Sequence, residues 1–485
     1  MKFYIFGALF LLLPITTSAQ NFTDPVYQIK TESNLTYGSA TDFAGNVRTL
    51  VMDISYPTND TAPTCGRPLM VMVHGGAFMA GNQNSASVGS LRTDFAKRGY
   101  TTASVTYRLG LFQTNRNVHC NASSFGIEWD CLNMTDSSEW YRAYYRGVQD
   151  VRGAIRYLVK NAAKYNIDPQ NVFVVGESAG GFIALGVGYM DDTSEVLGNL
   201  IGSMNDVKPP NNIYQSPCVV KYNLDTSIAS MKYKRPELGS LNGTLNPLSG
   251  KTYTLQGVGN FYGAVFNNLF KSTTNNPPAL YMFHQPNDLI VPYSSAKVFA
   301  GYNACATGFP FSCAGIINRP VIWGSKGIQA FIDSAAVGGG VAPRYRFDKT
   351  SNTANCAIQL ADPSKAGHRI DNYAMRSRNM AHFFADEIEP CTNSGLVEES
   401  FNNAHRVYPN PAESIGSIRI SGSFNSGDRV EIHDALGRLF LQHTVMKSSQ
   451  EVQLNETNGV PPGVYTISVR SIDTKWVQKL ILSTN

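Results

Sequence analysis

The chain has 485 residues, of which 43% are hydrophobic and 16% are charged, and its formal net charge is +4. This balance predicts well-buried globular domains, two or three by length, rather than long disordered tails. No run of basic residues interleaved with aromatic ones occurs, which argues against nucleic acid as a partner.

The first 19 residues have the form of a signal peptide. Lys2 supplies the positive end, residues 3–13 are apolar, and Thr17-Ser18-Ala19 is a small-residue cleavage site. The apolar run is shorter than the roughly 20 residues that a spanning helix needs, and no later segment is long and apolar enough. We therefore expect an exported mature chain that starts at Gln20 and has no integral membrane segment.

Export makes the eight cysteines candidates for disulfide bonds. Cys120 with Cys131 and Cys305 with Cys313 are candidate local bridges, which leaves Cys65, Cys218, Cys356 and Cys391. We expect Cys356 to pair with Cys391, because this bond would join the segments that flank His368. No C-x-x-C or H-E-x-x-H motif occurs, so neither a zinc site nor a redox dithiol is indicated.

From about residue 25 to residue 391, strand-like and helix-like segments alternate. We expect strands at 69–73, 101–107, 172–175 and 279–283, and helices at 88–98, 140–165 and 370–389. One face of the helix at 140–165 is apolar and carries Val148, Val151, Ile155, Leu158 and Ala162. Repeated strand–helix–strand units predict an α/β domain with a mostly parallel sheet and helices on both faces.

Two long connections, residues 110–140 and about 205–260, lack clear periodicity. They are rich in Asn, Ser, Tyr, Pro and Gly. Stretches of this length inside a compact domain are often functional loops or lids. Two interpretations remain open, loops that form the walls of a pocket and loops on the surface without a function, and the sequence favours neither interpretation.

The composition changes after Cys391. Residues 392–405 are polar and linker-like, and short alternating strands follow at 417–421, 429–434, 439–444, 452–454, 464–470 and 476–482. Turns are expected at 436–438 and 458–463. Residues 406–485 therefore form a predicted small all-β sandwich that follows the domain at 20–391.

A G-x-S-x-G motif follows the apolar run at 172–175. Gly176-Glu177-Ser178-Ala179-Gly180 has the form of a nucleophile elbow, a tight strand-to-helix turn that presents one serine hydroxyl. Serine needs a base to activate it, and the base needs an acid to orient it. With this elbow the expected chain order is serine, acid, histidine.

Asp288 and His368 are the expected partners of Ser178. Asp288 lies just past the strand at 279–283, and His368 lies in a loop before the last helix. Asp348 and Asp362 are the alternative acids, but neither follows such a clear strand. His284 comes before the acid, which breaks the order, and His382 falls inside a helix.

His74-Gly75-Gly76-Ala77-Phe78 directly follows the strand at 69–73 and has the form of an H-G-G oxyanion loop. We assign the N–H groups of Gly75, Gly76 and Ala179 as the oxyanion donors. Glycines let this backbone approach a substrate closely. We expect His74 to brace the loop rather than to react.

Residues 65–391 resemble the α/β-hydrolase carboxylesterases, the group that includes the type-B and hormone-sensitive-lipase-like esterases. The matching segments are residues 74–78, 107–110 (Tyr-Arg-Leu-Gly), 168–172 (Asp-Pro-Gln-Asn-Val) and 176–181 (Gly-Glu-Ser-Ala-Gly-Gly). The resemblance implies the α/β-hydrolase fold, carboxylic-ester hydrolysis through an acyl-enzyme, and no cofactor. Glu177 and Ala179 beside the serine are typical of esterases, whereas related prolyl peptidases more often have an aromatic residue after it.

Residues 407–485 resemble the C-terminal sorting domain of the type IX secretion system of Bacteroidetes. The match is carried by residues 408–411 (Tyr-Pro-Asn-Pro), 434–438 (Asp-Ala-Leu-Gly-Arg), 462–465 (Pro-Gly-Val-Tyr) and 479–482 (Lys-Leu-Ile-Leu). It implies export past the outer membrane, with the secretion machinery as a partner. A β-module that binds substrate is the alternative.

The sequence thus predicts a secreted or surface-held bacterial serine carboxylesterase. The alternative is a polymer-directed esterase for feruloylated or acetylated polysaccharide or for a polyester, with an aromatic cleft from Trp129, Trp140 and Tyr141. A serine peptidase is a further alternative, as is a non-catalytic surface binding protein, against which the intact set of triad residues argues. The long loops leave the acyl group and the alcohol of the ester open.

Overall fold

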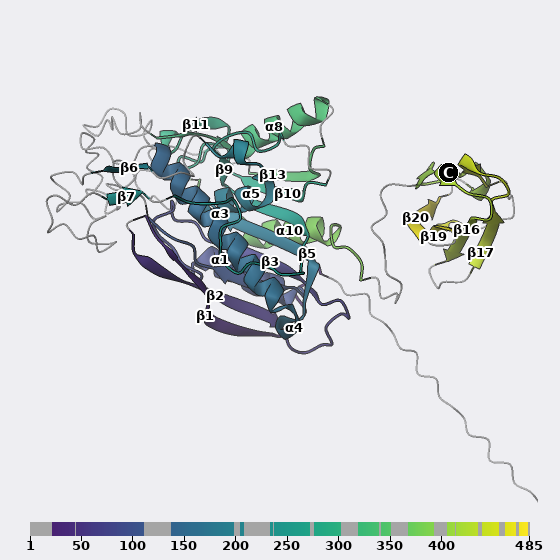
Figure 1. Ribbon diagram of the computed structural model, residues 1–485, viewed down its shortest axis with the longest axis horizontal. Coiled ribbons are helices and arrows are strands. Elements are labelled where there is room, and N and C mark those ends of the chain that lie inside the picture. Colours follow the sequence, from purple (N-terminus) through teal and green to yellow (C-terminus); the bar gives the residue numbers. More distant parts are fainter. Residues whose placement is uncertain are drawn as a thin grey trace, which may run out of the picture. The chain divides into compact units, whose positions relative to one another are not determined.

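The computed structural model describes residues 22–43, 45–110, 137–197, 204–207, 233–235, 237–271, 276–301, 319–338, 341–350, 367–391, 405–412, 414–434, 439–454, 461–471 and 475–483. The chain divides into two compact units, Met1–Thr392 and Asn393–Asn485 (Figure 1). The predicted signal peptide, the predicted cysteine pairs Cys120–Cys131 and Cys305–Cys313, and most of the two long connections lie outside the described residues. Within the described part of the chain, no helix is long and apolar enough to cross a membrane.

The first unit is built on an eight-stranded sheet with the order β1-β2-β4-β3-β5-β8-β10-β13. In this order the strands are Ile29–Thr41, Val47–Pro57, Thr101–Val105, Arg67–Val73, Ile167–Glu177, Leu255–Phe261, Ala279–His284 and Tyr345–Lys349. β1 and β2 are antiparallel to their neighbours, and all strands from β4 to β13 run parallel. The predicted mostly parallel sheet is therefore present.

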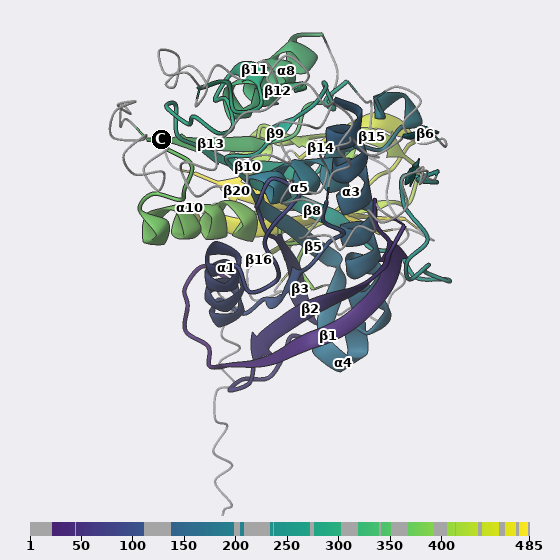
Figure 2. The ribbon, with the colours of Figure 1, turned by 90° about the vertical axis from the view of Figure 1, so that its left-hand side faces the viewer.

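Helices cover both faces of this sheet. α1 (Ala86–Lys97) and α10 (Tyr373–Ala385) lie on one face, and α3 (Ser137–Lys160) and α5 (Ala179–Tyr189) lie on the other (Figure 2). Successive residues of β3 alternate between the two cores, with Met70 and Met72 on the α1 side and Val71 on the α3 side. This alternation is the two-residue period of a strand that is buried on both faces.

The long helix predicted at 140–165 is divided. α3 ends at Lys160, and α4 (Ala162–Tyr165) follows as one short turn. Four of the five predicted face residues, Val148, Val151, Ile155 and Leu158, are fully buried in the core. Asn166 then ends α4 in the left-handed conformation, at φ 50°, directly before β5.

β8 corrects the prediction that residues 205–260 are without regular structure. It lies between β5 and β10 near the centre of the sheet. Gly257 and Gly259 lower its intrinsic strand propensity, which hid it in the sequence. A Cβ on Gly257 would lie 2.7 Å from a ring atom of Phe384 and 2.8 Å from one of Phe173, so glycine is what lets helix and sheet aromatics pack here.

Smaller elements complete the first unit. They are a three-stranded sheet of β11 (Ser295–Lys297), β12 (Val321–Gly324) and β9 (Ala264–Val265), the pair β6 (Met204–Val207) and β7 (Tyr233–Arg235), and the helix α8 (Ser325–Val337). α8 begins directly after β12, so its first turn lies beside the end of β10 through Ser325.

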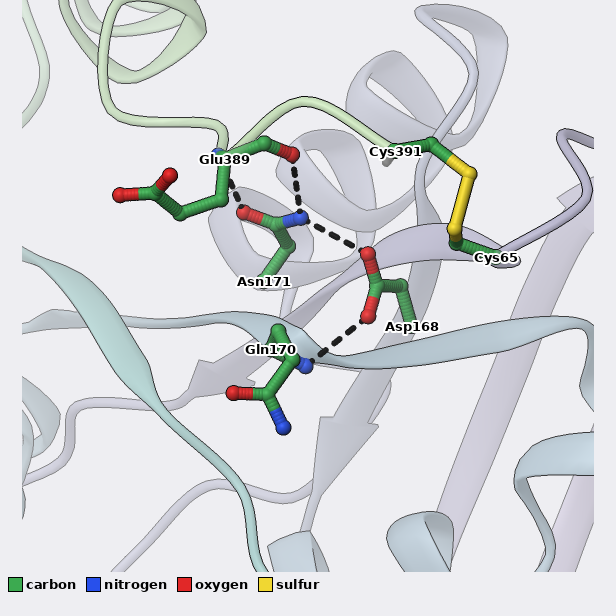
Figure 3. The surroundings of a disulfide bond; sticks show 6 residues. All are labelled: Cys65, Asp168, Gln170, Asn171, Glu389 and Cys391. Carbon is green, nitrogen blue, oxygen red and sulfur yellow. Dashed lines mark hydrogen bonds between the residues drawn. A yellow bond between two sulfur atoms is a disulfide. The ribbon is translucent and has the colours of Figure 1, made fainter. Parts of the chain in front are cut away.

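The disulfide bond of Cys391 differs from the prediction. Cys391 pairs with Cys65, with a Cα–Cα distance of 5.7 Å, and not with Cys356 (Figure 3). After α10 the chain reaches the start of β3 and β5, where the side chain of Asn171 donates to the carbonyl of Glu389 at 3.0 Å and accepts from its N–H at 2.7 Å. The prediction was wrong because it assumed that Cys391 stays near His368, whereas α10 carries it to the other end of the strands.

The second unit is a small sandwich of two antiparallel sheets. One sheet contains β14 (His405–Tyr408), β15 (Arg419–Phe424) and β18 (Ser449–Gln453), and the other contains β17 (Leu439–Thr444), β16 (Arg429–Asp434), β19 (Gly463–Arg470) and β20 (Lys475–Leu482). Buried residues from both sheets, among them Ile420, Ile432 and Ile467, form one core. The predicted all-β architecture is therefore present.

Candidate active site

Ser178 occupies a strained turn between β5 and α5. Its backbone has φ 52° and ψ −123°, a conformation that residues other than glycine rarely adopt. The neighbouring glycines make the turn possible, since a Cβ on Gly176 would lie 2.0 Å from the carbonyl oxygen of Gly180. The turn has the form of the predicted nucleophile elbow.

The structure brings Ser178, His368 and Asp288 into one hydrogen-bonded line. His368 Nε2 lies 2.7 Å from Ser178 Oγ, and His368 Nδ1 lies 2.6 Å from Asp288 Oδ2. Because a carboxylate only accepts, Nδ1 carries the proton and Nε2 is free to accept from the serine hydroxyl. Ser178 follows β5 and Asp288 follows β10, so both lie at the carboxyl ends of parallel strands.

The Asp288 carboxylate is buried and held by several donors. Its Oδ1 accepts from the N–H groups of Ile290 at 2.8 Å and Val291 at 3.0 Å. Burial raises the pKa of Asp288, but the electrostatic attraction of the His368 imidazole and the hydrogen bonds from His284 and His368 outweigh burial, so the net pKa is below its ordinary value. The group is therefore an anion at neutral pH, able to orient an imidazole and stabilise an imidazolium.

The other acids and histidines considered from the sequence lie elsewhere. Asp348 is on β13 and accepts hydrogen bonds from Tyr281 and Asn379. His382 is exposed on α10, and Asp362 is outside the described residues. His284 is fully buried beside Asp288, with its Nε2 at 3.2 Å from Asp288 Oδ2.

The glycine loop after β3 lies against the elbow. Gly76, Ala77 and Phe78 all have positive φ, at 103°, 53° and 61°. A Cβ on Gly75 would lie 3.0 Å from the Cβ of Ser178, so this backbone passes directly beside the serine. Ala179 is buried as the first residue of α5, where the N–H has no acceptor within the helix.

His74 supports this loop from behind. Its ring stacks on Tyr107 at 4.4 Å, and its Nδ1 lies 2.7 Å from the carbonyl oxygen of Gly75. Burial lowers the pKa of His74 to about 4. A neutral, fully buried ring packed under the loop fits the expected bracing role.

Tyr262 was missed by sequence reasoning. Its ring lies 4.6 Å from that of His368, and its hydroxyl donates to Glu177 Oε2 at 2.7 Å. The residue directly follows β8, the strand that was also missed. Recognition of β8 would have placed Tyr262 at the same sheet edge as Ser178 and Asp288.

A cavity of about 490 Å³ opens at the serine. Its wall combines small residues, polar residues and two larger apolar side chains, and includes Gly75, Gly76, Ser85, Ser87, Ile290, Phe299 and Arg369. Two residues of the expected aromatic cleft, Trp140 and Tyr141, are not part of this wall. Trp140 is buried with its ring centroid 6.5 Å from that of Phe299, and the ring of Tyr141 packs on Phe266 at 5.1 Å. Trp129 lies outside the described residues.

Comparison with known proteins gives two family matches. Residues 52–116 and 138–302 match the BD-FAE family, and residues 406–483 match the family described as secretion system C-terminal sorting domain. The first match contains the glycine loop, the elbow and Asp288, and it ends before His368.

Individual relatives match shorter parts of the chain. Carboxylesterase 3B of Mus musculus is 30% identical over 134 residues, which is 28% of this chain and 19% of the mouse protein. Neuroligin-like protein glit-1 of Caenorhabditis elegans is 34% identical over 113 residues, 23% of this chain and 12% of that protein. The matched stretch thus spans less than a fifth of the length of either relative.

Among solved structures, a truncated form of a carbohydrate esterase from gut microbiota is 16% identical, with a TM-score of 0.38, and the match covers 76% of this chain and 99% of that one. The family matches are the more specific finding. The chain therefore combines a BD-FAE esterase-family domain with a C-terminal sorting domain of the type IX secretion system of Bacteroidetes, a signal for the outer surface or the extracellular space.

Proposed function

We propose that the chain is a secreted serine hydrolase of carboxylic esters, with Ser178, His368 and Asp288 as its triad. The proposal rests above all on the continuous line from Ser178 Oγ through both ring nitrogens of His368 to Asp288 Oδ2, with contacts of 2.7 and 2.6 Å. The serine end of this line opens into the cavity, and the acid end is buried. This arrangement is what an activated serine requires.

In the proposed reaction, Ser178 Oγ attacks the ester carbonyl while His368 Nε2 takes its proton. Asp288 holds the ring and stabilises the imidazolium. The N–H groups of Gly75, Gly76 and Ala179 receive the oxyanion. His368 then passes the proton to the leaving alcohol, and an acyl-enzyme remains on Ser178. Water, activated by the same imidazole, releases the acid and restores the serine.

Esters are favoured over peptides as substrates. Glu177 and Ala179 flank the serine as in esterases, and the named relatives include Carboxylesterase 3B of mouse. An enzyme exported by the sorting domain would meet polymeric as well as soluble esters, so a polymer-directed esterase is the second candidate. In this proposal the mature enzyme starts at Gln20, the catalytic domain ends at 391, and residues 392–405 link it to the sorting domain. The secretion machinery is then its protein partner.

Fluorophosphonate labelling combined with ester hydrolysis tests the proposal. The folded wild-type chain should be labelled on Ser178 and should hydrolyse chromogenic esters. Ser178→Ala should lose labelling, and its kcat should fall by on the order of 10⁶, with the fold retained. A Ser178→Ala variant that keeps most of the esterase activity would overturn the assignment. A panel of acyl lengths, feruloyl esters and polymers then separates the two candidates, since activity confined to short soluble esters removes the second.

A further inference from the structure

A second imidazole lies on the far side of the Asp288 carboxylate. His284 is the last residue of β10, and its Nε2 is 3.2 Å from Asp288 Oδ2. This is the same oxygen that accepts from His368 Nδ1 at 2.6 Å. Two rings therefore converge on one carboxylate oxygen, one from the β10 strand end and one from the loop before α10.

The surroundings of His284 determine which of its nitrogens carries the proton. The backbone N–H of Ser325 approaches Nδ1 at 3.3 Å, and an N–H donor requires a lone pair there. The carbonyl oxygen of Val291 lies 3.1 Å from Nε2, and a carbonyl can only accept. Both contacts select the neutral ring with its proton on Nε2, and this proton lies between Val291 and Asp288.

The scaffold behind His284 is itself buried and hydrogen-bonded. Ser325 Oγ lies 3.1 Å from His284 Nδ1, and Asn260 Nδ2 donates to the same hydroxyl at 3.4 Å. The first residue of α8, a 13-residue helix, thus faces His284 with its backbone N–H. The Tyr293 ring also packs nearly perpendicular to the His284 ring, with their centroids 5.6 Å apart.

We propose that His284 is a positioning residue of the triad: its Nε2–H fixes the Asp288 carboxylate so that Oδ2 stays aligned with His368. The inference rests on the proposed function, because it concerns the same triad. The Ile290 and Val291 N–H groups donate to Oδ1, and His284 and His368 contact Oδ2, so each oxygen of the carboxylate has two partners that oppose its rotation. Without His284, Oδ2 has one donor fewer, and His368 is the remaining side chain that donates to it.

Substitutions at position 284 separate the effect of losing the hydrogen bond from the effect of changing the volume of the side chain. His284→Leu removes the donor at similar volume, and His284→Gln places an amide N–H near the position of Nε2. We expect His284→Leu to lower kcat by about 10- to 100-fold, the scale of a small misplacement of a catalytic group. KM should remain within about twofold, because substrate contacts are unchanged. His284→Gln should restore kcat to within about fivefold of wild type.

Ile332→Ala is the matched control. Ile332 is a buried residue of α8 without a polar side chain, so this variant loosens the same helix but leaves the donor to Asp288 in place. It should lose stability and keep kcat. If Ile332→Ala lowered kcat as much as His284→Leu does, or if His284→Leu kept the wild-type kcat, the positioning role would be refuted.

NMR of the ¹⁵N-histidine-labelled full chain gives a readout that does not depend on activity. The His284 ring should show a protonated Nε2 and an unprotonated Nδ1. The opposite tautomer contradicts the inference. Because this measurement uses the wild-type chain, it decides the question even if His284→Leu fails to fold. Failure of the proposed function is distinguishable: an active Ser178→Ala variant overturns both ideas, whereas an inactive Ser178→Ala variant beside a fully active His284→Leu variant overturns this one alone.

Discussion

Gly180 packs against the backbone of Val73 so closely that a Cβ on Gly180 would lie 2.1 Å from the Val73 carbonyl oxygen. The contact joins the first turn of α5 to the end of β3, the strand that leads into the oxyanion loop. No real Cβ tolerates this distance, and the atoms in the way are backbone, which cannot rotate aside. The glycine two residues after Ser178 is therefore required by the packing of α5 against β3.

Gly180→Ala should destabilise the protein although alanine is the better helix former. The helical gain is about 0.5–1 kcal/mol, whereas forcing a methyl group into a filled site costs about 1–3 kcal/mol or more. Gly89→Ala in α1 is the matched control, because a Cβ there meets nothing within 4 Å. Denaturant unfolding should show a loss for Gly180→Ala and a small gain for Gly89→Ala. Equal stability of the two variants would show that the close contact is absent.

The stability of the protein should depend on pH through His74. The pKa of the buried ring is lowered from 6.5 to about 4, so the unfolded chain binds one more proton between these values. The contribution of the neutral His74 ring to the free energy of unfolding is intact above about pH 6.5. It is lost as the pH falls toward 4, by up to about 3 kcal/mol in total.

Unfolding free energies measured from pH 4 to pH 7 check this expectation. In that range wild type should gain up to about 1.4 kcal/mol per pH unit more than His74→Gln does. His382→Gln, at an exposed position on α10, is the matched control for the loss of a histidine outside the core. Parallel curves for wild type and His74→Gln would mean that the ring titrates alike in the folded and unfolded chain.

The local parts of this site were accessible from the sequence, because each depends on a few adjacent residues. The elbow needs glycines at 176 and 180, and the oxyanion loop needs glycines directly after a strand. The residues Asp288 and His368 were identified by chain order and by their place in loops. The structure brings them within hydrogen-bonding distance of each other and of Ser178.

What the sequence did not provide depends on contacts between distant segments. β8 is glycine-rich because Phe173 and Phe384 fill the space at Gly257, and neither residue is near it in the chain. The place of Tyr262 beside the site could not be predicted, because it follows from β8. His284 was set aside because it breaks the order of a triad, and order says nothing about a residue that contacts the acid from behind. The disulfide partner of Cys391 depends on the position that the chain reaches at the end of α10.

Removal of the Cys65–Cys391 bond should lower stability without changing turnover. The bond joins residues 326 positions apart, so its loss releases a very long loop in the unfolded chain and should cost about 2–5 kcal/mol. The double variant Cys65→Ser, Cys391→Ser should unfold at a lower temperature than wild type under oxidising conditions. Its kcat at 25 °C should be unchanged, because the bond precedes β3 whereas the oxyanion loop follows it. A large loss of kcat in folded protein would contradict this separation.

Tyr262→Phe tests the hydrogen bond beside the nucleophile. The change keeps the ring 4.6 Å from His368 and removes the hydroxyl that donates to Glu177. Glu177 is only 9% exposed, so its carboxylate cannot replace this donor freely with water. Since a hydrogen bond to a charged group contributes about 1.5–3 kcal/mol, Tyr262→Phe should lose stability of that order.

A double-mutant cycle with Glu177→Gln isolates the contact between Tyr262 and Glu177. The two changes together should cost less than the sum of the single changes, with a coupling of at least about 0.5 kcal/mol, because Tyr262→Phe removes the donor of this bond and Glu177→Gln removes the charge of its acceptor. Turnover of Tyr262→Phe should stay within a few-fold of wild type, since the ring against His368 remains. Additive costs would show that hydroxyl and carboxylate act independently.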